Sequence, residues 1–173
     1  RLKANTDEVI ARGGFGSPTI FVNGSDMYFG NDRLPLVREA VELVKGPLDQ
    51  GGVVVEIAPG LPVVQADRRR LLEVYQNLVE NAAKFSAGSP APRIEIGARS
   101  DGGEPVFYVK DNGRGIEPRF LERVFDLFEK LDPGASGTGV GLALVRRIVE
   151  AHGGRIWVDE SYENGTKISF SLP

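Results

Sequence analysis

Apolar residues recur three and four positions apart in two stretches of this 173-residue chain, which predicts two amphipathic helices. The first covers residues 33–44, with Asn31 or Asp32 as its N-cap. The second is longer and runs from about Asp67 to Phe85, with Asp67 as its N-cap. Shorter helical patterns cover residues 3–12, 117–130 and 139–151.

Runs of alternating or continuous apolar residues predict strands in the rest of the chain. TIFVN and DMYFG, joined around Asn23-Gly24, predict a β-hairpin because Asn-Gly tolerates the positive φ of a tight turn. We expect GPLDQGG, residues 46–52, to be an irregular break. The other predicted strands are VVVEIA, PVVQA, RIEIGAR, PVFYVKD, RIWVDE and TKISFSL. For residues 50–173 these elements predict an α/β fold, a two-layer sandwich with helices on one face of a mixed or antiparallel sheet.

Composition narrows the class of protein. Hydrophobic residues make up 41% and charged residues 26% of the chain, as in soluble globular proteins. The net charge of −3, with both signs well mixed, argues against nucleic-acid binding and against a basic membrane patch. No apolar run approaches the roughly 20 residues that span a bilayer, so we expect no membrane insertion. The absence of cysteine excludes disulfides, thiol nucleophiles and thiolate metal sites.

The long helix carries a polar stripe. At about 100° per residue, four polar side chains fall within an arc of roughly 80°. They are Glu73, Asn77, Asn81 and Lys84. A different face collects Leu71, Val74, Leu78, Ala82 and Phe85, which we expect in the core. The stripe could ligate a hard cation and pair with phosphate, or it could be a solvated face. Asparagine is a poor helix former without another role, which favours the first interpretation.

Three further motifs follow. The first is DNGRGI, residues 111–116, which is either a plain hairpin turn or a place where two glycines let a ligand approach the backbone. In the second case Asp111 could accept a hydrogen bond from an exocyclic amine. Phe125 and Phe128 have the spacing of core positions on a short helix. SGTGVGL leads into a helix whose N-terminal N–H groups could bind phosphate, although its glycine spacing is not that of a dinucleotide-binding fold.

Taken in order, these motifs resemble the N, G1, F and G2 boxes of the ATP-binding domain of sensor histidine kinases. The resemblance runs from about residue 36 to 173 and includes ADRRRL and ENGTKISFSLP. It implies an α/β sandwich of the histidine-kinase ATPase type, with ATP between the helices and a flexible lid. The F-box distinguishes the chain from the gyrase, Hsp90 and MutL relatives.

The resemblance also implies roles for individual residues. Asn81 would be the Mg²⁺ ligand with Asn77 beside it and Glu73 as a further candidate, while Lys84 would face the phosphates and Asp111 would hold the adenine amino group. Glu73, Asn77 and Lys84 would be the catalytic positions, although Glu73 matches the water-activating base of ATP-hydrolysing relatives rather than a kinase base. Phe125 and Phe128 would belong to the lid region. The remaining ATP contacts would be Gly113, Gly115, Ile116, Phe128, Gly137, Thr138, Gly139, Gly141, Leu142 and Thr166.

The single histidine, His152, ends the helix that follows the glycine-rich loop. In the kinases that the chain resembles, the phosphoacceptor histidine lies on a separate dimerisation domain. A histidine in the last turn complements the helix dipole, and the glycine after it is an ordinary C-cap. We therefore expect His152 to be structural and the acceptor histidine to be supplied in trans.

The first 44 residues or so resemble a different family, the C-terminal end of kappa-class glutathione transferases and 2-hydroxychromene-2-carboxylate isomerases. Gly16-Ser17-Pro18-Thr19 would match their cis-proline loop and Asn31-Asp32-Arg33 their γ-glutamyl contacts. The resemblance covers only the last hairpin and helix of a thioredoxin-like fold, without the half that bears the catalytic residue. We therefore predict two units, 1–45 and 46–173, with a seam near 33–46.

The sequence thus predicts a catalytic domain of a two-component sensor histidine kinase that binds ATP and Mg²⁺ and phosphorylates a histidine in trans. Its expected partners are the dimerisation domain and, indirectly, a response regulator. We expect it in the cytoplasm, on its own or as the cytoplasmic part of a membrane-anchored kinase. The alternative is a catalytically silent nucleotide-binding or regulatory module. A thiol-conjugating enzyme is disfavoured because the catalytic half is missing.

Overall fold

The computed structural model describes residues 19–22, 26–29, 33–62, 64, 66–128 and 139–173. Its helices are α2 (Arg33–Leu43), α3 (Lys45–Gly51), α4 (Arg68–Ser86) and α5 (Gly141–Ala151), with 3₁₀ turns η1 (Pro118–Phe120) and η2 (Arg123–Phe125). Its strands are β1 (Thr19–Val22), β2 (Asp26–Phe29), β3 (Val54–Ile57), β4 (Arg93–Asp101), β5 (Glu104–Asp111), β6 (Arg155–Val158) and β7 (Lys167–Ser171).

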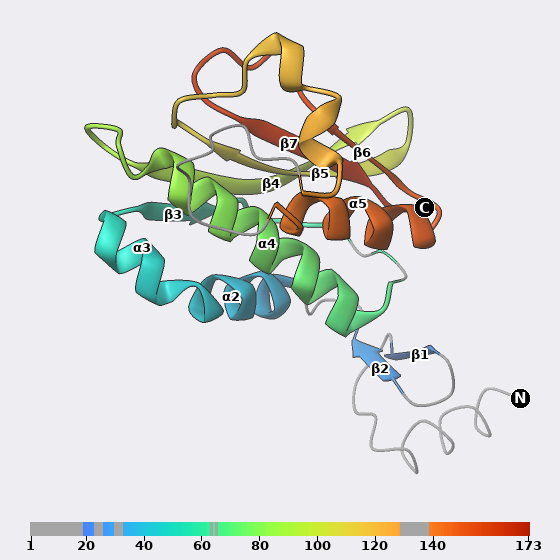
Figure 1. Cartoon of the computed structure of the whole chain (residues 1–173). Coiled ribbons are helices and arrows are strands. Elements are labelled where there is room, and N and C mark those ends of the chain that lie inside the picture. The colour runs from blue at the N-terminus through green and yellow to red at the C-terminus, as the bar shows by residue number, and fades with distance from the viewer. Residues whose placement is uncertain (1–18, 23–25, 30–32, 63, 65, 129–138) are drawn as a thin grey trace, which may run out of the picture.

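The main sheet is mixed and has the strand order β3-β4-β5-β7-β6. β3 pairs with β4 in parallel, and the other neighbours pair antiparallel. Figure 1 shows the helices together on one side of this sheet. The predicted α/β sandwich with a mixed sheet is therefore confirmed.

The core lies between the sheet and α4 with α5. The amphipathic faces predicted for α4 bury Leu71, Val74 and Leu78, because an apolar stripe of a helix is stable only against another apolar surface. On the sheet side Phe170 is fully buried, stacked on Phe107 at 5.3 Å between ring centroids. α2 covers the other side of α4 and adds buried side chains to the same core: Leu36, Val37, Ala40 and Val44.

The predicted β-hairpin is present, with β1 paired antiparallel to β2 from Thr19↔Phe29 to Val22↔Asp26. The Asn23-Gly24 turn lies outside the described residues, as do the predicted helix over 3–12 and the caps Asn31 and Asp32. The thioredoxin-like origin predicted for this segment is not confirmed.

The break predicted at residues 46–52 is wrong, because α3 occupies Lys45–Gly51. Pro47 is tolerated in the first turn of a helix, where its missing N–H would have had no intrahelical acceptor. Leu48 is buried and holds the helix on the core. Gly52 caps the end of the helix, and its φ of 61° lets its N–H bond back to the carbonyl oxygens of Leu48 and Asp49 in the last turn.

Two other predicted elements differ. The described residues of PVVQA, namely Pro62, Val64 and Ala66, belong to no strand, because Val64 and Ala66 pack into the core from an irregular segment. The helix predicted from residue 117 is replaced, as far as Phe128, by the short turns η1 and η2. Residues 129 and 130 lie outside the described residues.

Candidate functional site

Two residues of the polar stripe of α4, Asn77 and Asn81, lie beside the N-terminus of α5. Asn77 Nδ2 donates a hydrogen bond to the carbonyl oxygen of Glu73 at 2.8 Å. The Oδ1 atom of the same carboxamide therefore faces away from that carbonyl. A Cβ built on Gly141 would lie 2.8 Å from Asn77 Oδ1 and 3.8 Å from Asn81 Nδ2. The small residue at the start of α5 therefore lets that helix terminus approach both asparagines.

Glu73 points elsewhere. Its carboxylate accepts a hydrogen bond from Arg70 Nη1 at 3.0 Å, one turn back on the same helix. The structure thus brings Asn77 and Asn81 together but pairs the Glu73 carboxylate with an arginine.

Asp111, the last residue of β5, is a buried carboxylate with 6% of its surface exposed. Its Oδ1 accepts hydrogen bonds from the N–H of Gly113 at 2.8 Å and of Thr166 at 3.4 Å. The backbone N–H of Asp111 also donates to the carbonyl oxygen of Thr166 at 2.8 Å. Burial raises the pKa of Asp111 to about 6, although the two N–H donors act in the opposite direction.

Close backbone contacts explain the glycines of the DNGRGI loop. A Cβ on Gly113 would lie 2.3 Å from the carbonyl oxygen of Phe85, so the loop abuts the end of α4. Gly115 has a φ of 73°, which only glycine adopts readily. Gly165, which precedes Thr166, has a φ of 135° and no room for a Cβ beside the Asp111 carbonyl. The backbones of α4, β5 and the start of β7 are therefore in close contact around Asp111.

Phe128 and Gly139, the described residues on either side of positions 129–138, are hydrogen-bonded to each other. The N–H of Phe128 donates to the carbonyl oxygen of Gly139 at 2.9 Å. Phe128 has a φ of 63°, unusual for a residue with a side chain, and its side chain is 75% exposed. Gly137 and Thr138 lie outside the described residues.

The other predicted site residues separate into core and surface positions. Phe125 is buried, as its interpretation as a core residue predicts, whereas the same prediction for Phe128 is wrong because that side chain is exposed. Ile116 and Leu142 are partly buried against the core, and Thr166 is buried.

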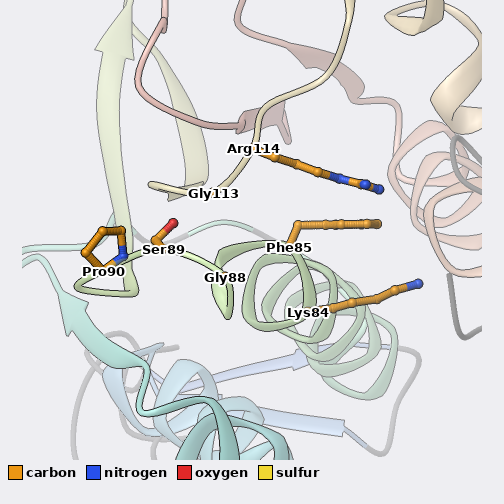
Figure 2. A pocket seen from close by; sticks show the side chains of 7 residues that line it. All are labelled: Lys84, Phe85, Gly88, Ser89, Pro90, Gly113 and Arg114. Carbon is orange, nitrogen blue, oxygen red and sulfur yellow. The ribbon is translucent and has the colours of Figure 1, made fainter.

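A pocket of about 480 Å³ opens where α4 ends against the DNGRGI loop (Figure 2). It is lined by Lys84, Phe85, Gly88, Ser89, Pro90, Gly113 and Arg114. Phe85, which we expected in the core, is instead only partly buried and lines this pocket. Sequence reasoning missed both Phe85 and Arg114 as site residues. The sequence signal that could have identified them is that Phe85 follows Lys84 and that Arg114 lies between two glycines.

His152 is held at both ring nitrogens. Nδ1 lies 2.8 Å from the carbonyl oxygen of Ile148 and donates to it, while Nε2 accepts from the N–H of Asp67 at 3.2 Å. This pattern requires a neutral ring with its hydrogen on Nδ1. His152 therefore links the end of α5 to the cap of α4, in agreement with the structural role predicted for it.

Among the described residues no group of three His, Cys, Asp or Glu side chains could hold a metal ion. The carboxamides of Asn77 and Asn81 remain as oxygen donors near the start of α5. Such a set fits Mg²⁺, which keeps several waters and is bound through few protein oxygens together with substrate phosphates. Within the described part of the chain, no helix combines the length and apolar character needed to cross a bilayer.

Comparison with known proteins adds sequence and structural matches. The sequence model of one protein family, "Histidine kinase-, DNA gyrase B-, and HSP90-like ATPase", matches residues 66–173. The methanogenesis regulatory histidine kinase FilI of Methanothrix harundinacea is 47% identical over 138 residues, 80% of this chain and 16% of FilI. The chain therefore spans less than a fifth of that relative.

Solved structures agree with the sequence matches. The mycobacterial sensor histidine kinase MprB superposes with a TM-score of 0.69 at 29% identity, over 81% of this chain and 93% of that one. Full-length ShkA in complex with AMPPNP superposes with a TM-score of 0.71 at 28% identity, over 98% of this chain and 34% of ShkA.

Proposed function

Because this chain belongs to the histidine kinase-, DNA gyrase B- and HSP90-like ATPase family, we propose that it is the ATP·Mg²⁺-binding catalytic domain of a two-component sensor histidine kinase. It transfers the γ-phosphoryl group of ATP to a histidine supplied in trans. The observation that carries the proposal is the meeting of α4, the DNGRGI loop and β7 around the buried carboxylate of Asp111. The nucleotide is further supported by ShkA, which was solved with AMPPNP.

Asp111 recognises the base. Its Oδ1 is occupied by two backbone N–H groups, which leaves the other carboxylate oxygen to accept from the adenine amino group. Gly113 and Gly115 shape the adenine pocket, and Ile116 and Thr166 lie beside the base. Burial of the Asp111 carboxylate favours adenine over a base with an acceptor at that position, since two acceptors would face each other unpaired.

The phosphates lie against α4 and the start of α5. Lys84 offsets their charge, and Asn77 and Asn81 hold Mg²⁺ through their carboxamide oxygens. Gly139, Gly141 and Leu142 contact the phosphate chain at the positive end of the α5 dipole. Gly137 and Thr138, which lie outside the described residues, are proposed as further phosphate contacts from their place in the motif alone. Bound Mg²⁺ supplies neutralisation of phosphate charge, and phosphoryl transfer then depends mainly on positioning.

Phe128 and Phe125 belong to the lid region that covers the nucleotide. Glu73 is a candidate metal or water-organising group only if its carboxylate leaves Arg70, with which it now pairs. His152 is excluded as the acceptor because both ring nitrogens are engaged.

The partners and place of action follow from this role. The histidine-bearing dimerisation domain receives the phosphoryl group, and a response regulator receives it afterwards. We propose that the chain acts in the cytoplasm, on its own or as part of a membrane-anchored kinase.

The test is phosphoryl transfer from γ-labelled ATP to a separately expressed dimerisation domain of a sensor histidine kinase. We expect label on that domain, none when its acceptor histidine is replaced by glutamine, and strong loss with Asn81→Ala. Gln76→Ala is the matched control, because Gln76 is a carboxamide on α4 that pairs with Glu80 outside the stripe, and it should transfer normally. ATP binding without any transfer would instead indicate the alternative, a catalytically silent nucleotide-binding module.

A further inference from the structure

Two cations sandwich one aromatic ring at the pocket. Lys84 Nζ and the guanidinium carbon of Arg114 each lie 4.9 Å from the centroid of the Phe85 ring. Figure 2 shows the three side chains layered, with Arg114 and Lys84 on opposite faces of Phe85 and all extending in the same direction. Cation–π contacts of this kind favour the layered arrangement of the three side chains.

The backbone sets the position of Arg114 from both sides. Gly113 abuts the Phe85 carbonyl with no room for a side chain, and its N–H is bonded to Asp111 Oδ1 at 2.8 Å. Gly115 has a φ of 73°, and a Cβ on it would lie 3.3 Å from the Gly165 carbonyl oxygen. Arg114 is therefore presented to Phe85 by the same loop that holds the buried carboxylate.

The charge of the pocket indicates its ligand. Among the seven described residues that line it, two are cations and none carries a carboxylate. A phosphate chain carries several negative charges, so both cations attract it. A guanidinium also binds phosphate oxygens through two parallel N–H groups, a geometry that lysine cannot provide.

We propose that Arg114 is a second phosphate-binding residue, which acts with Lys84 across the Phe85 ring to hold the phosphate chain of the nucleotide. This inference rests on the proposed function and deepens it, because it adds to the site a residue that the sequence motifs did not single out. Arg114 contributes charge and direction, whereas Asp111 contributes recognition of the base.

The test compares the binding of ATP and of adenosine by calorimetry, in the wild-type chain and in Arg114→Gln. We expect the variant to bind ATP about tenfold more weakly, as for the loss of one charge-assisted contact, and adenosine unchanged. Arg114→Lys keeps the charge but not the two parallel N–H groups, so it should recover only part of the ATP affinity. Arg155→Gln is the matched control, since Arg155 stacks on the Trp157 ring at 5.0 Å and lines no part of the pocket.

The outcomes separate the two proposals. If the wild-type chain binds ATP and Arg114→Gln binds it with the same affinity, the role of Arg114 is overturned and the proposed function is not. Equal losses for ATP and adenosine also overturn that role, because Arg114 then only shapes the pocket. A folded wild-type chain that binds neither ligand overturns the proposed function, and this inference with it.

Discussion

Asp111 shows most clearly how a single residue sets the behaviour of the site. Its carboxylate is buried among backbone N–H donors, and its pKa is raised to about 6 because burial outweighs those hydrogen bonds. A buried carboxylate of this kind lowers the stability of the ligand-free protein, but it offers an acceptor to a ligand that donates a hydrogen bond. The residue is thus a candidate for recognition rather than for stability.

ATP affinity is predicted to fall on the order of tenfold between pH 7.5 and pH 5, because protonation of Asp111 below its pKa of about 6 removes an acceptor for the adenine amine. Calorimetry across this range measures the change. Asp111→Asn should show no such step, and the ratio of the two affinities removes the titration of ATP itself. A pH-independent ratio would contradict the assignment.

The stability of the empty protein should change in the opposite direction. Since the folded pKa lies above the ordinary value of 3.8, the folded state binds the proton more tightly than the unfolded state. The free energy of unfolding therefore falls as the pH rises from about 4 to about 6, by at most about 3 kcal/mol, and stays low above. Chemical denaturation should show this decline in the wild-type chain and not in Asp111→Asn.

Gly113 tests the contact between the loop and α4. Gly113→Ala should lower ATP affinity tenfold or more, because its Cβ would lie 2.3 Å from the Phe85 carbonyl oxygen and the loop would have to move. Gly88→Ala is the control in the same pocket, since a Cβ there meets nothing within 4 Å. If both variants bind ATP as the wild-type chain does, the close contact has no functional role.

At the scale of the elements, α4 and α5 are tied together at the end opposite the DNGRGI loop. Asp67 caps α4 by accepting from the N–H of Arg70 at 3.1 Å, and its own N–H donates to His152 at the end of α5. The capping was predictable from sequence, because aspartate before an apolar period is a common helix start. The histidine link was not, since it joins residues 85 positions apart.

His152→Ala should destabilise the fold by about 1–2 kcal/mol, because it leaves the Asp67 N–H without its acceptor. ATP affinity and phosphoryl transfer in trans should remain within about twofold of the wild type. Denaturation and transfer assays measure the two effects. Arg146→Gln, which breaks an exposed pair with Glu150, should cost less than about 0.5 kcal/mol. Loss of transfer with ATP binding intact would show that His152 takes part in the chemistry.

At the scale of the whole molecule, apolar patterns predicted the helices α2, α4 and α5 and a mixed or antiparallel sheet, since burial of one face decides those elements. Short segments were harder to predict. Pro47 and the flanking glycines suggested a break where α3 forms, because the burial of Leu48 outweighs weak local propensity. The stripe of α4 and the position of Asp111 were predicted, whereas Phe85 and Arg114 were not. Their contact depends on how the DNGRGI loop meets α4 in three dimensions.

The packing of α2 bears on where the ATP-binding unit begins. Leu36, Val37, Ala40 and Val44 are buried in the core shared with α4. We therefore propose that the unit starts at α2, within the seam predicted near residues 33–46.

Deletion of residues 1–32 should leave the free energy of unfolding within about 1 kcal/mol of the full chain, with ATP binding retained. Deletion of residues 1–44 removes four buried apolar side chains and should unfold the protein, since each large one contributes about 1.5–3 kcal/mol. Denaturation of both truncated chains measures this. If deletion of residues 1–32 already unfolds the protein, the ATP-binding unit begins before residue 33.

Nucleotide binding at Asp111 is tested most directly by titration calorimetry with ATP, with and without Mg²⁺, on the wild-type chain and on Asp111→Asn. Binding should depend on Mg²⁺ and should be weakened at least tenfold by the substitution. A folded wild-type chain that binds no ATP in either condition would contradict the proposed function, and the motifs would then mark a family member that no longer holds a nucleotide.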